Sequence, residues 1–283
     1  MTSIEYIKPK SLDEALEAKR KFPEASFIAG GTDIIVKMKY KVKNPAVLIS
    51  LRSIPDLSGI SVSNNQVRIG ATTTITDIIN NAELGEKLPF LKEAAGSLGS
   101  RQIRNVATVG GNLCNSSPCA NMAPPLLVLD ATVELKSRTA NRTLPLHEFF
   151  LGPDKNCASN EEIVTAFSFN LPSVTTKALF YKKGRVKMDI ASASIAVLLS
   201  MDGTVCRKAR IAVGSVAPIP LRLFDVEKDM EQVPLTRQTG ERLLKRIGES
   251  ISPITDIRSQ KEYREQVILV YFKRALETLI DWN

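Results

Sequence analysis

Two short glycine motifs, about 80 residues apart, offer the groups that point most clearly to chemistry in this sequence. The first is Ile28-Ala29-Gly30-Gly31-Thr32-Asp33, and the second is Thr108-Val109-Gly110-Gly111-Asn112-Leu113. Paired glycines let the backbone approach an anion without an intervening Cβ, and successive N–H groups can then bind it. Either motif alone is equally consistent with a tight turn. Two motifs with the same layout favour a bipartite dinucleotide site.

The common nucleotide-binding fingerprints are absent from the sequence. No Gly-x-Gly-x-x-Gly follows the first expected strand, and no Gly-x-x-x-x-Gly-Lys-Ser/Thr occurs, so neither a nicotinamide-type Rossmann site nor a P-loop is predicted. The remaining dinucleotide option is a flavin bound by a different fold.

Further motifs follow the glycine pairs in a fixed order. They are residues 103–115 (IRNVATVGGNLCN), 123–131 (APPLLVLDA), 188–191 (MDIA) and 214–220 (GSVAPIP). With the first glycine motif, this set is similar to the FAD-binding medium subunit of molybdenum hydroxylases, which include bacterial xanthine dehydrogenases and carbon monoxide dehydrogenases. The resemblance covers nearly the whole chain.

The resemblance implies an α+β fold. Residues 1–171 would form a two-lobed FAD-binding domain of the vanillyl-alcohol-oxidase/PCMH type, with the boundary between its lobes near residue 55. Residues 172–283 would form a smaller C-terminal domain of the carbon monoxide dehydrogenase flavoprotein type, with an antiparallel sheet and helices. The residues alone also suggest an α+β tail domain, because expected strands are followed by expected helices after a turn at 171–173.

The resemblance also implies a function and partners. The chain would be an oxidoreductase subunit with noncovalent FAD, taking electrons from the 2Fe-2S clusters of a small subunit and passing them to an acceptor, with NAD+ favoured. A large subunit would hold molybdopterin, and the assembly would be a dimer of heterotrimers. Residues 101–105 and 188–191 favour the xanthine or purine dehydrogenase branch. The alternatives are a carbon monoxide, nicotinate or aldehyde dehydrogenase subunit, a self-contained flavin oxidase, or a scaffold that has lost FAD.

The cofactor contacts implied by the resemblance fall on both glycine motifs and on isolated positions elsewhere. They are Ile28, Ala29, Gly30, Gly31, Thr32, Asp33, Ile34, Leu98, Thr108, Gly110, Gly111, Asn112, Asn121, Val164, Lys182 and Asp189. Asn121 departs from the family, in which many members have an aspartate, so an amide replaces a charged group there. Lys183 is an alternative to Lys182. No catalytic side chain and no metal ligand are predicted.

Composition narrows the remaining possibilities. The 283 residues are 43% hydrophobic and 24% charged, which is typical of a globular protein, and no apolar run reaches the length of a membrane span. The start of the chain lacks a signal-peptide layout, so a cytoplasmic location is expected. The net charge of +8 is spread along the chain. Short clusters such as 37–43 are better explained by a solvated or partner-facing surface than by nucleic-acid binding.

The cysteines and the single histidine predict no active centre. Cys114, Cys119, Cys157 and Cys206 match no zinc or ferredoxin spacing, and burial as small apolar side chains is expected. His147 has no evident nucleophile partner, so a structural or exposed role is favoured.

The elements expected to position the motifs follow from caps and periodicity. Ser11 and Glu14 predict a capping box that opens a helix inside a strand–helix–strand unit. Strands are expected at 26–29, before the first glycine pair, and at 106–109, before the second. The other expected strands are 46–51, 67–71, 132–137, 162–170, 178–183, 192–200 and 207–213, and the other expected helices are 75–81, 88–98, 221–230, 236–247 and 260–280.

Overall fold

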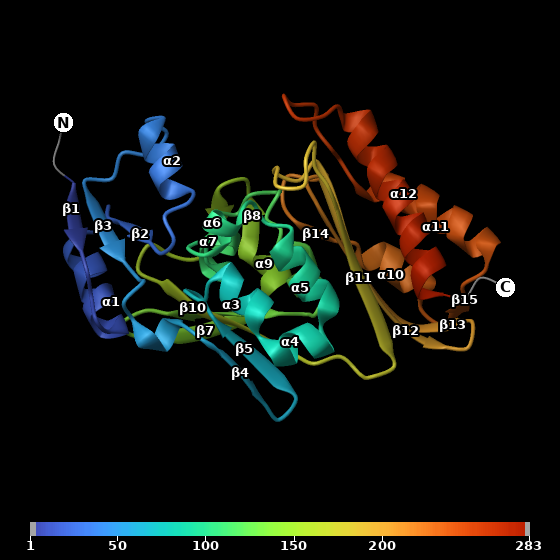
Figure 1. Cartoon of the computed structure of the whole chain (residues 1–283), viewed down its shortest axis with the longest axis horizontal. Helices are drawn as coiled ribbons and strands as arrows, with labels where there is room; N and C mark the ends of the chain where they lie inside the picture. Colours follow the sequence, from blue (N-terminus) through green and yellow to red (C-terminus); the bar gives the residue numbers. More distant parts are fainter. Residues whose placement is uncertain (1–3, 281–283) are drawn as a thin grey trace.

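The computed structural model describes residues 4–280, and three sheets of three or more strands follow one another along its long axis (Figure 1). The first sheet is parallel, with the order β1-β3-β2. Its elements are β1 (Glu5–Ile7), α1 (Leu12–Lys21), β2 (Ser26–Ile28), α2 (Ile34–Lys39) and β3 (Val47–Ser50). The expected strand–helix–strand unit is therefore present. Half of the capping box is present too, since the Ser11 hydroxyl accepts the Glu14 N–H, while the Glu14 carboxylate accepts the N–H of Lys10.

The second sheet is antiparallel, with the order β4-β5-β10-β6-β7. Its strands are β4 (Ile60–Ser63), β5 (Gln66–Gly70), β6 (Thr132–Lys136), β7 (Asn141–Pro145) and β10 (Ile163–Asn170). The chain between β5 and β6 forms α3 (Ile75–Asn80), α4 (Ala82–Lys87), α5 (Pro89–Gly96), α6 (Arg101–Arg104), α7 (Val109–Cys114) and α8 (Ala123–Val128). Shorter elements are η1 (Pro55–Leu57), α9 (Leu146–Phe149), β8 (Phe150–Gly152) and β9 (Lys155–Asn156).

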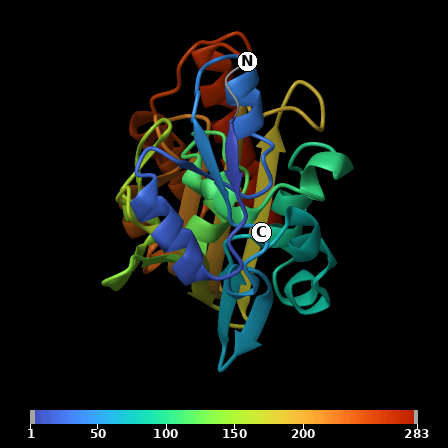
Figure 2. The ribbon, with the colours of Figure 1, turned by 90° about the vertical axis from the view of Figure 1, so that its left-hand side faces the viewer.

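The third sheet is also antiparallel and carries three helices on one face. Its elements are β11 (Thr176–Lys183), β12 (Ala193–Asp202), β13 (Val205–Gly214), β14 (Leu221–Arg222), α10 (Phe224–Met230), β15 (Val233–Pro234), α11 (Arg237–Ser250) and α12 (Lys261–Leu279). In Figure 1 the helices α11 and α12 lie at the end of the molecule opposite the first sheet, and Figure 2 views the molecule from the first-sheet end.

Strand β12 joins two hydrophobic cores, because its side chains alternate between the two faces of the third sheet. Ile195, Val197 and Leu199 pack with α10, α11 and α12. Ala196 and Leu198 belong instead to the core of the helices that precede β6. The strand is thus buried on both faces, which explains its nearly unbroken apolar sequence.

Two expected elements differ in the structure. Residues 106–109 are not a strand, because Thr108 caps α7 and its hydroxyl accepts the N–H of Gly111 at 3.0 Å. Residues 221–230 are not one helix. Leu221 and Arg222 pair with β13 first, and α10 begins at Phe224.

Candidate functional site

The first glycine motif forms the turn between β2 and α2, and its backbone N–H groups are free. Gly31 has φ +75°, which a glycine adopts without the steric cost that a Cβ would bring. Within residues 4–280, no protein acceptor meets the N–H of Gly30, Gly31, Thr32, Asp33 or Ile34. Five successive free donors at a helix start form an anion-binding surface.

The second glycine motif has a different role from the one expected of it, because its N–H groups are already bonded. The N–H of Val109 donates to Thr73 O and that of Gly110 to Ala71 O, at 3.1 and 2.8 Å. The N–H groups of Gly111 and Asn112 bond to Thr108. The motif therefore supplies a wall rather than a second row of free donors.

The four positions require glycine for three different structural reasons. A Cβ on Gly30 would overlap the carbonyl oxygen of Val106, and a Cβ on Gly110 would lie 2.5 Å from Ala71 O, so both residues allow close backbone packing. Gly31 supplies the positive φ. A Cβ on Gly111 would meet only the Thr108 hydroxyl, at 3.1 Å, and would otherwise face open space. Gly111 is thus the glycine that leaves room for a ligand.

Two adjoining cavities, of about 630 and 500 Å³, border the glycine motifs and share part of their walls. Together they form one cleft between the first sheet and the helices that precede β6. Except for Gly110 and Val164, every residue expected to contact the cofactor lines the larger cavity. Those two residues line the smaller one. The structure therefore brings all the expected site residues to one cleft.

Three expected residues on the wall of the larger cavity lie at the loop that follows α5. The amide of Asn121 donates to the Ser97 hydroxyl at 2.9 Å, and the Lys182 ammonium donates to Ser97 O at 2.6 Å. Leu98 follows directly on the cleft wall. The Asn121 side chain is therefore already bonded within the protein in this buried position.

Lys182, rather than Lys183, faces the cleft. Lys182 lines the larger cavity, whereas Lys183 is exposed outside it. Burial lowers the pKa of Lys182, and the charge of Asp189, with a further contribution from Cys119, opposes that shift. Asp189 itself accepts a hydrogen bond from Arg185 at 3.0 Å. The cleft thus holds a half-buried cation beside a carboxylate.

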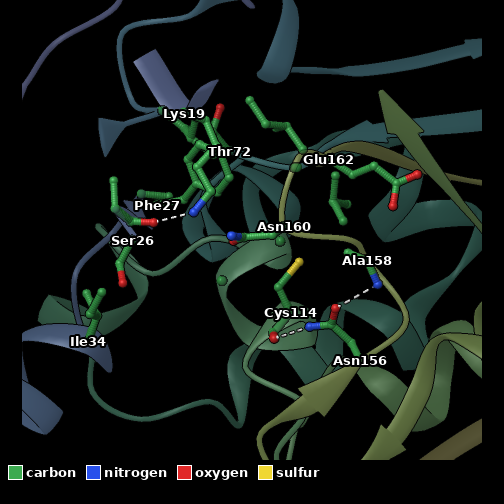
Figure 3. A pocket seen from close by; sticks show the side chains of 18 of the residues that line it. Lys19, Ser26, Phe27, Ile34, Thr72, Cys114, Asn156, Ala158, Asn160 and Glu162 are labelled. Atoms are coloured by element: carbon green, nitrogen blue, oxygen red, sulfur yellow. Dashed lines mark hydrogen bonds between the residues drawn. The ribbon is translucent and has the colours of Figure 1, made fainter. Parts of the chain in front are cut away.

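The smaller cavity contains polar residues that sequence reasoning missed. Figure 3 shows Lys19 and Asn160 pointing toward one another, and both donate to the carbonyl of Pro23, at 2.6 and 2.9 Å. Lys19 also donates to Ala25 O. Burial lowers the pKa of Lys19. The sequence did contain one sign of this role, because Lys19 interrupts the apolar stripe of the first helix.

Glu162 fixes the wall of the smaller cavity. Its carboxylate accepts two hydrogen bonds from Arg142, at 2.6 and 2.9 Å, and one from the N–H of Ser159, at 2.7 Å. These bonds lower the pKa of Glu162 to about 2. The segment from β9 to β10 is therefore held against the cleft by a charged pair.

Two lysines that follow the first glycine motif also line the cleft. Lys37, on α2, donates to Asn115 Oδ1 at 2.7 Å and to Asp154 Oδ1 at 2.6 Å, so it ties α2 to the end of α7 and to the turn between β8 and β9. Lys43 lines both cavities. Neither lysine is part of a glycine motif, and the sequence suggested only a solvated or partner-facing cluster.

The cysteines are less uniformly buried than expected. Only Cys206 is fully buried, whereas Cys114 and Cys119 lie on the cleft wall and Cys157 is half-buried. Burial raises the pKa of the Cys114 thiol to about 12, a shift that favours the protonated thiol. Among residues 4–280, no group of three or more acidic, cysteine or histidine side chains is arranged to hold a metal.

His147 lies outside both cavities. Its ring packs edge-on against Phe224, with 5.1 Å between the ring centroids. A role in packing at the surface, as expected from the sequence, matches this position. In the described part of the chain, no helix combines the length and the apolar character needed to span a membrane.

Two family models match the chain in succession. The model described as the FAD binding domain in molybdopterin dehydrogenase matches residues 2–172. The model described as the CO dehydrogenase flavoprotein C-terminal domain matches residues 178–279. The first of these domains contains both glycine motifs and the whole of the smaller cavity.

Individual proteins are similar to the chain over nearly all of its residues. The xanthine dehydrogenase FAD-binding subunit of Escherichia coli is 31% identical, covering 97% of this chain and 95% of that protein. The carbon monoxide dehydrogenase medium chain of Afipia carboxidovorans is also 31% identical, covering 97% and 96%. The solved structure of reconstituted CO dehydrogenase from Oligotropha carboxidovorans includes a chain that aligns with a TM-score of 0.94 at 30% identity, covering 97% and 96%.

Proposed function

The chain belongs to the family of FAD-binding medium subunits of molybdenum hydroxylases, and we propose that it serves a xanthine or purine dehydrogenase of that family. In this role it accepts electrons from the 2Fe-2S clusters of a small subunit and delivers them to NAD+. A large subunit with molybdopterin oxidises the substrate. The three chains assemble as a heterotrimer, duplicated to a dimer of heterotrimers.

One observation carries the proposal for the cofactor: the five free N–H groups of residues 30–34 border the same cleft as the open position beside Gly111. A diphosphate at the N–H groups receives hydrogen bonds that no protein group competes for. Gly111 allows the ligand to approach the second wall. The cleft then extends in two directions from this point, as a dinucleotide requires.

Three residues of the larger cavity, Leu98, Lys182 and Asp189, orient the flavin ring. Leu98 provides an apolar surface, while Lys182 places its ammonium, and Asp189 its carboxylate, on the same cavity wall. Bound FAD supplies the exchange between one-electron and two-electron transfer, and the protein tunes it by charge and position. Val164 and the smaller cavity receive the opposite end of the dinucleotide. With the domain boundary that we propose between residues 171 and 172, all of these contacts except Lys182 and Asp189 belong to the first domain.

Precipitation of the protein with acid tests whether FAD is bound noncovalently. No side chain is proposed to form a flavin linkage, although Cys114 and Cys119 lie on the cleft wall. Acid precipitation of the purified protein should therefore release the yellow chromophore into the supernatant. Chromophore that stays in the pellet would contradict noncovalent binding.

A reduction assay tests the electron-transfer role. Under anaerobic conditions, NADH should bleach the flavin of the isolated chain, whereas xanthine or an aldehyde should not bleach it until the partner subunits are added. Bleaching by an organic substrate without partners would favour a self-contained flavin oxidase.

A second candidate is the flavoprotein subunit of a carbon monoxide, nicotinate or aldehyde dehydrogenase. It is favoured by the identity of 31% to a carbon monoxide dehydrogenase medium chain, which equals the identity to the xanthine dehydrogenase subunit. Turnover of the co-purified complex with xanthine, nicotinate, an aldehyde and carbon monoxide distinguishes the two candidates.

A further inference from the structure

Lys43 stands where the two cavities meet and has no acidic partner. It lines both cavities, a position that it shares with Ala29 and Gly111 of the glycine motifs and with Ile34 at the start of α2. Its side chain is exposed, and no carboxylate within residues 4–280 lies at ion-pair distance from it. Lys37, on the same wall, is already paired with Asp154. Lys43 is thus a cation available to a ligand.

The backbone that carries Lys43 is fixed by the end of α2. Lys41 adopts φ +59°, its N–H donates to Met38 O at 3.0 Å, and the N–H of Val42 donates to Lys37 O at 2.8 Å. This pair of bonds around a left-handed residue is a Schellman motif, which ends a helix and reverses the chain. The N–H of Lys43 also bonds to Lys37 O, at 3.3 Å. The turn therefore returns Lys43 toward the start of α2.

The first glycine motif lacks a positive side chain of its own. Its five N–H groups contribute only partial charges, and the Asp33 carboxylate lines the same cavity without capping α2. The diphosphate of a flavin dinucleotide carries about two negative charges at neutral pH, and phosphate binding is strengthened by a nearby full charge. A cation on this wall would add a full charge to the partial charges of the N–H groups, and Lys43 is placed to supply it.

We propose that Lys43 binds the diphosphate of FAD, an inference that rests on the FAD-binding function proposed above. Its ammonium donates to phosphate oxygens held by the N–H groups of residues 30–34. The contact selects flavins that carry phosphate over those that do not.

Charge removal at Lys43 tests this assignment against a matched control. Lys43→Met removes the ammonium and keeps the stem. Lys39→Met makes the same change in net charge on α2, at an exposed residue that lines neither cavity. Both apo-proteins are titrated with FAD and with riboflavin by fluorescence quenching, in about 50 mM and about 1 M salt, where the Debye lengths are about 14 and 3 Å.

We expect Lys43→Met to weaken FAD binding about 5- to 20-fold in low salt, since a tenfold change corresponds to about 1.4 kcal/mol and a hydrogen bond to a charged group is of this size. The loss should shrink in high salt. Riboflavin affinity should be unchanged, Lys43→Arg should restore most of the FAD affinity, and Lys39→Met should remain within about twofold of wild type. Unchanged melting temperatures of the apo-proteins will show that the fold is intact.

Three results would overturn the inference. Equal FAD affinities for Lys43→Met and Lys39→Met would show that Lys43 does not contact the diphosphate. Weaker assembly with a partner protein, with FAD affinity unchanged, would make Lys43 part of a protein interface instead. A wild-type chain that binds no FAD at all would remove the proposed function as well, and this outcome is separate from the first two.

Discussion

Alanine substitutions at Gly110 and Gly111 should have opposite effects on folding and on cofactor binding. At Gly110, the new Cβ would lie 2.5 Å from Ala71 O and 2.9 Å from Ala71 Cβ. These are backbone and short side-chain atoms that cannot rotate away, so α7 must shift relative to β5. Such overpacking costs about 1–3 kcal/mol, and strain on the Gly110 N–H bond to Ala71 O adds about 1 kcal/mol.

At Gly111, by contrast, the methyl group meets only the Thr108 hydroxyl at 3.1 Å. Gly111 lies in the first turn of α7 and does not have a positive φ, so alanine there gains helix propensity of up to about 1 kcal/mol. The methyl group projects into the cleft where the ligand must approach. We expect FAD binding about 10- to 100-fold weaker, which corresponds to about 1.4–2.8 kcal/mol.

Two measurements separate these effects. Melting of the apo-proteins should show Gly110→Ala lowered by about 4–16 °C, since 1 kcal/mol shifts a chain of this size by about 2–4 °C. Gly111→Ala should melt at or slightly above the wild-type temperature. Fluorescence titration should then show the affinity loss in Gly111→Ala. Wild-type FAD affinity in this variant, or a wild-type melting temperature in Gly110→Ala, would refute the division of roles between the two glycines.

Three further predictions follow from the contacts of the cleft. Glu162→Gln should lower the free energy of unfolding at neutral pH by about 2 kcal/mol and flatten its pH dependence between pH 4.5 and about 2. A carboxylate with a lowered pKa contributes stability that is fully present above pH 4.5 and is lost as the pH falls through about 2. Identical acid unfolding curves for the variant and the wild type would contradict this. Thr108→Val should destabilise the protein by about 1 kcal/mol through loss of the cap on Gly111, whereas Thr108→Ser should not, as thermal melting will test. Lys182→Met should lower the two-electron midpoint potential of bound flavin, by about 30 mV for each 1.4 kcal/mol by which the ammonium stabilises the reduced flavin. An unchanged or raised potential in a dye-coupled titration would place the ammonium away from the ring.

Local patterns determined much of the secondary structure. Ser11 predicted the start of α1, and α3 begins at Ile75, where the sequence placed the start of a helix. The long helix at the end of the chain and the strands from β10 to β13 also lie where periodicity placed them. Caps and periodicity act over a few residues, so a single sequence contains the information needed to predict them.

The tertiary structure decided what each glycine does. The sequence presents two similar Gly-Gly motifs, yet only the first has a row of free N–H groups. In the second motif, Thr73 O accepts the N–H of Val109 and Ala71 O accepts the N–H of Gly110. Those acceptors lie more than 30 residues away in the sequence. No spacing within the motif could reveal them.

The sequence by itself determined the family, most of the local elements and part of the set of residues that gather at the cleft. Only the tertiary structure decided that Lys182 faces the cleft, that Asn121 bonds to Ser97, and that Lys43 stands free where the two cavities meet. The physical reason is the range of the interactions. Hydrogen bonds in turns and caps join near neighbours, whereas a cleft wall is formed by packing between segments far apart in the chain, which local sequence patterns do not encode.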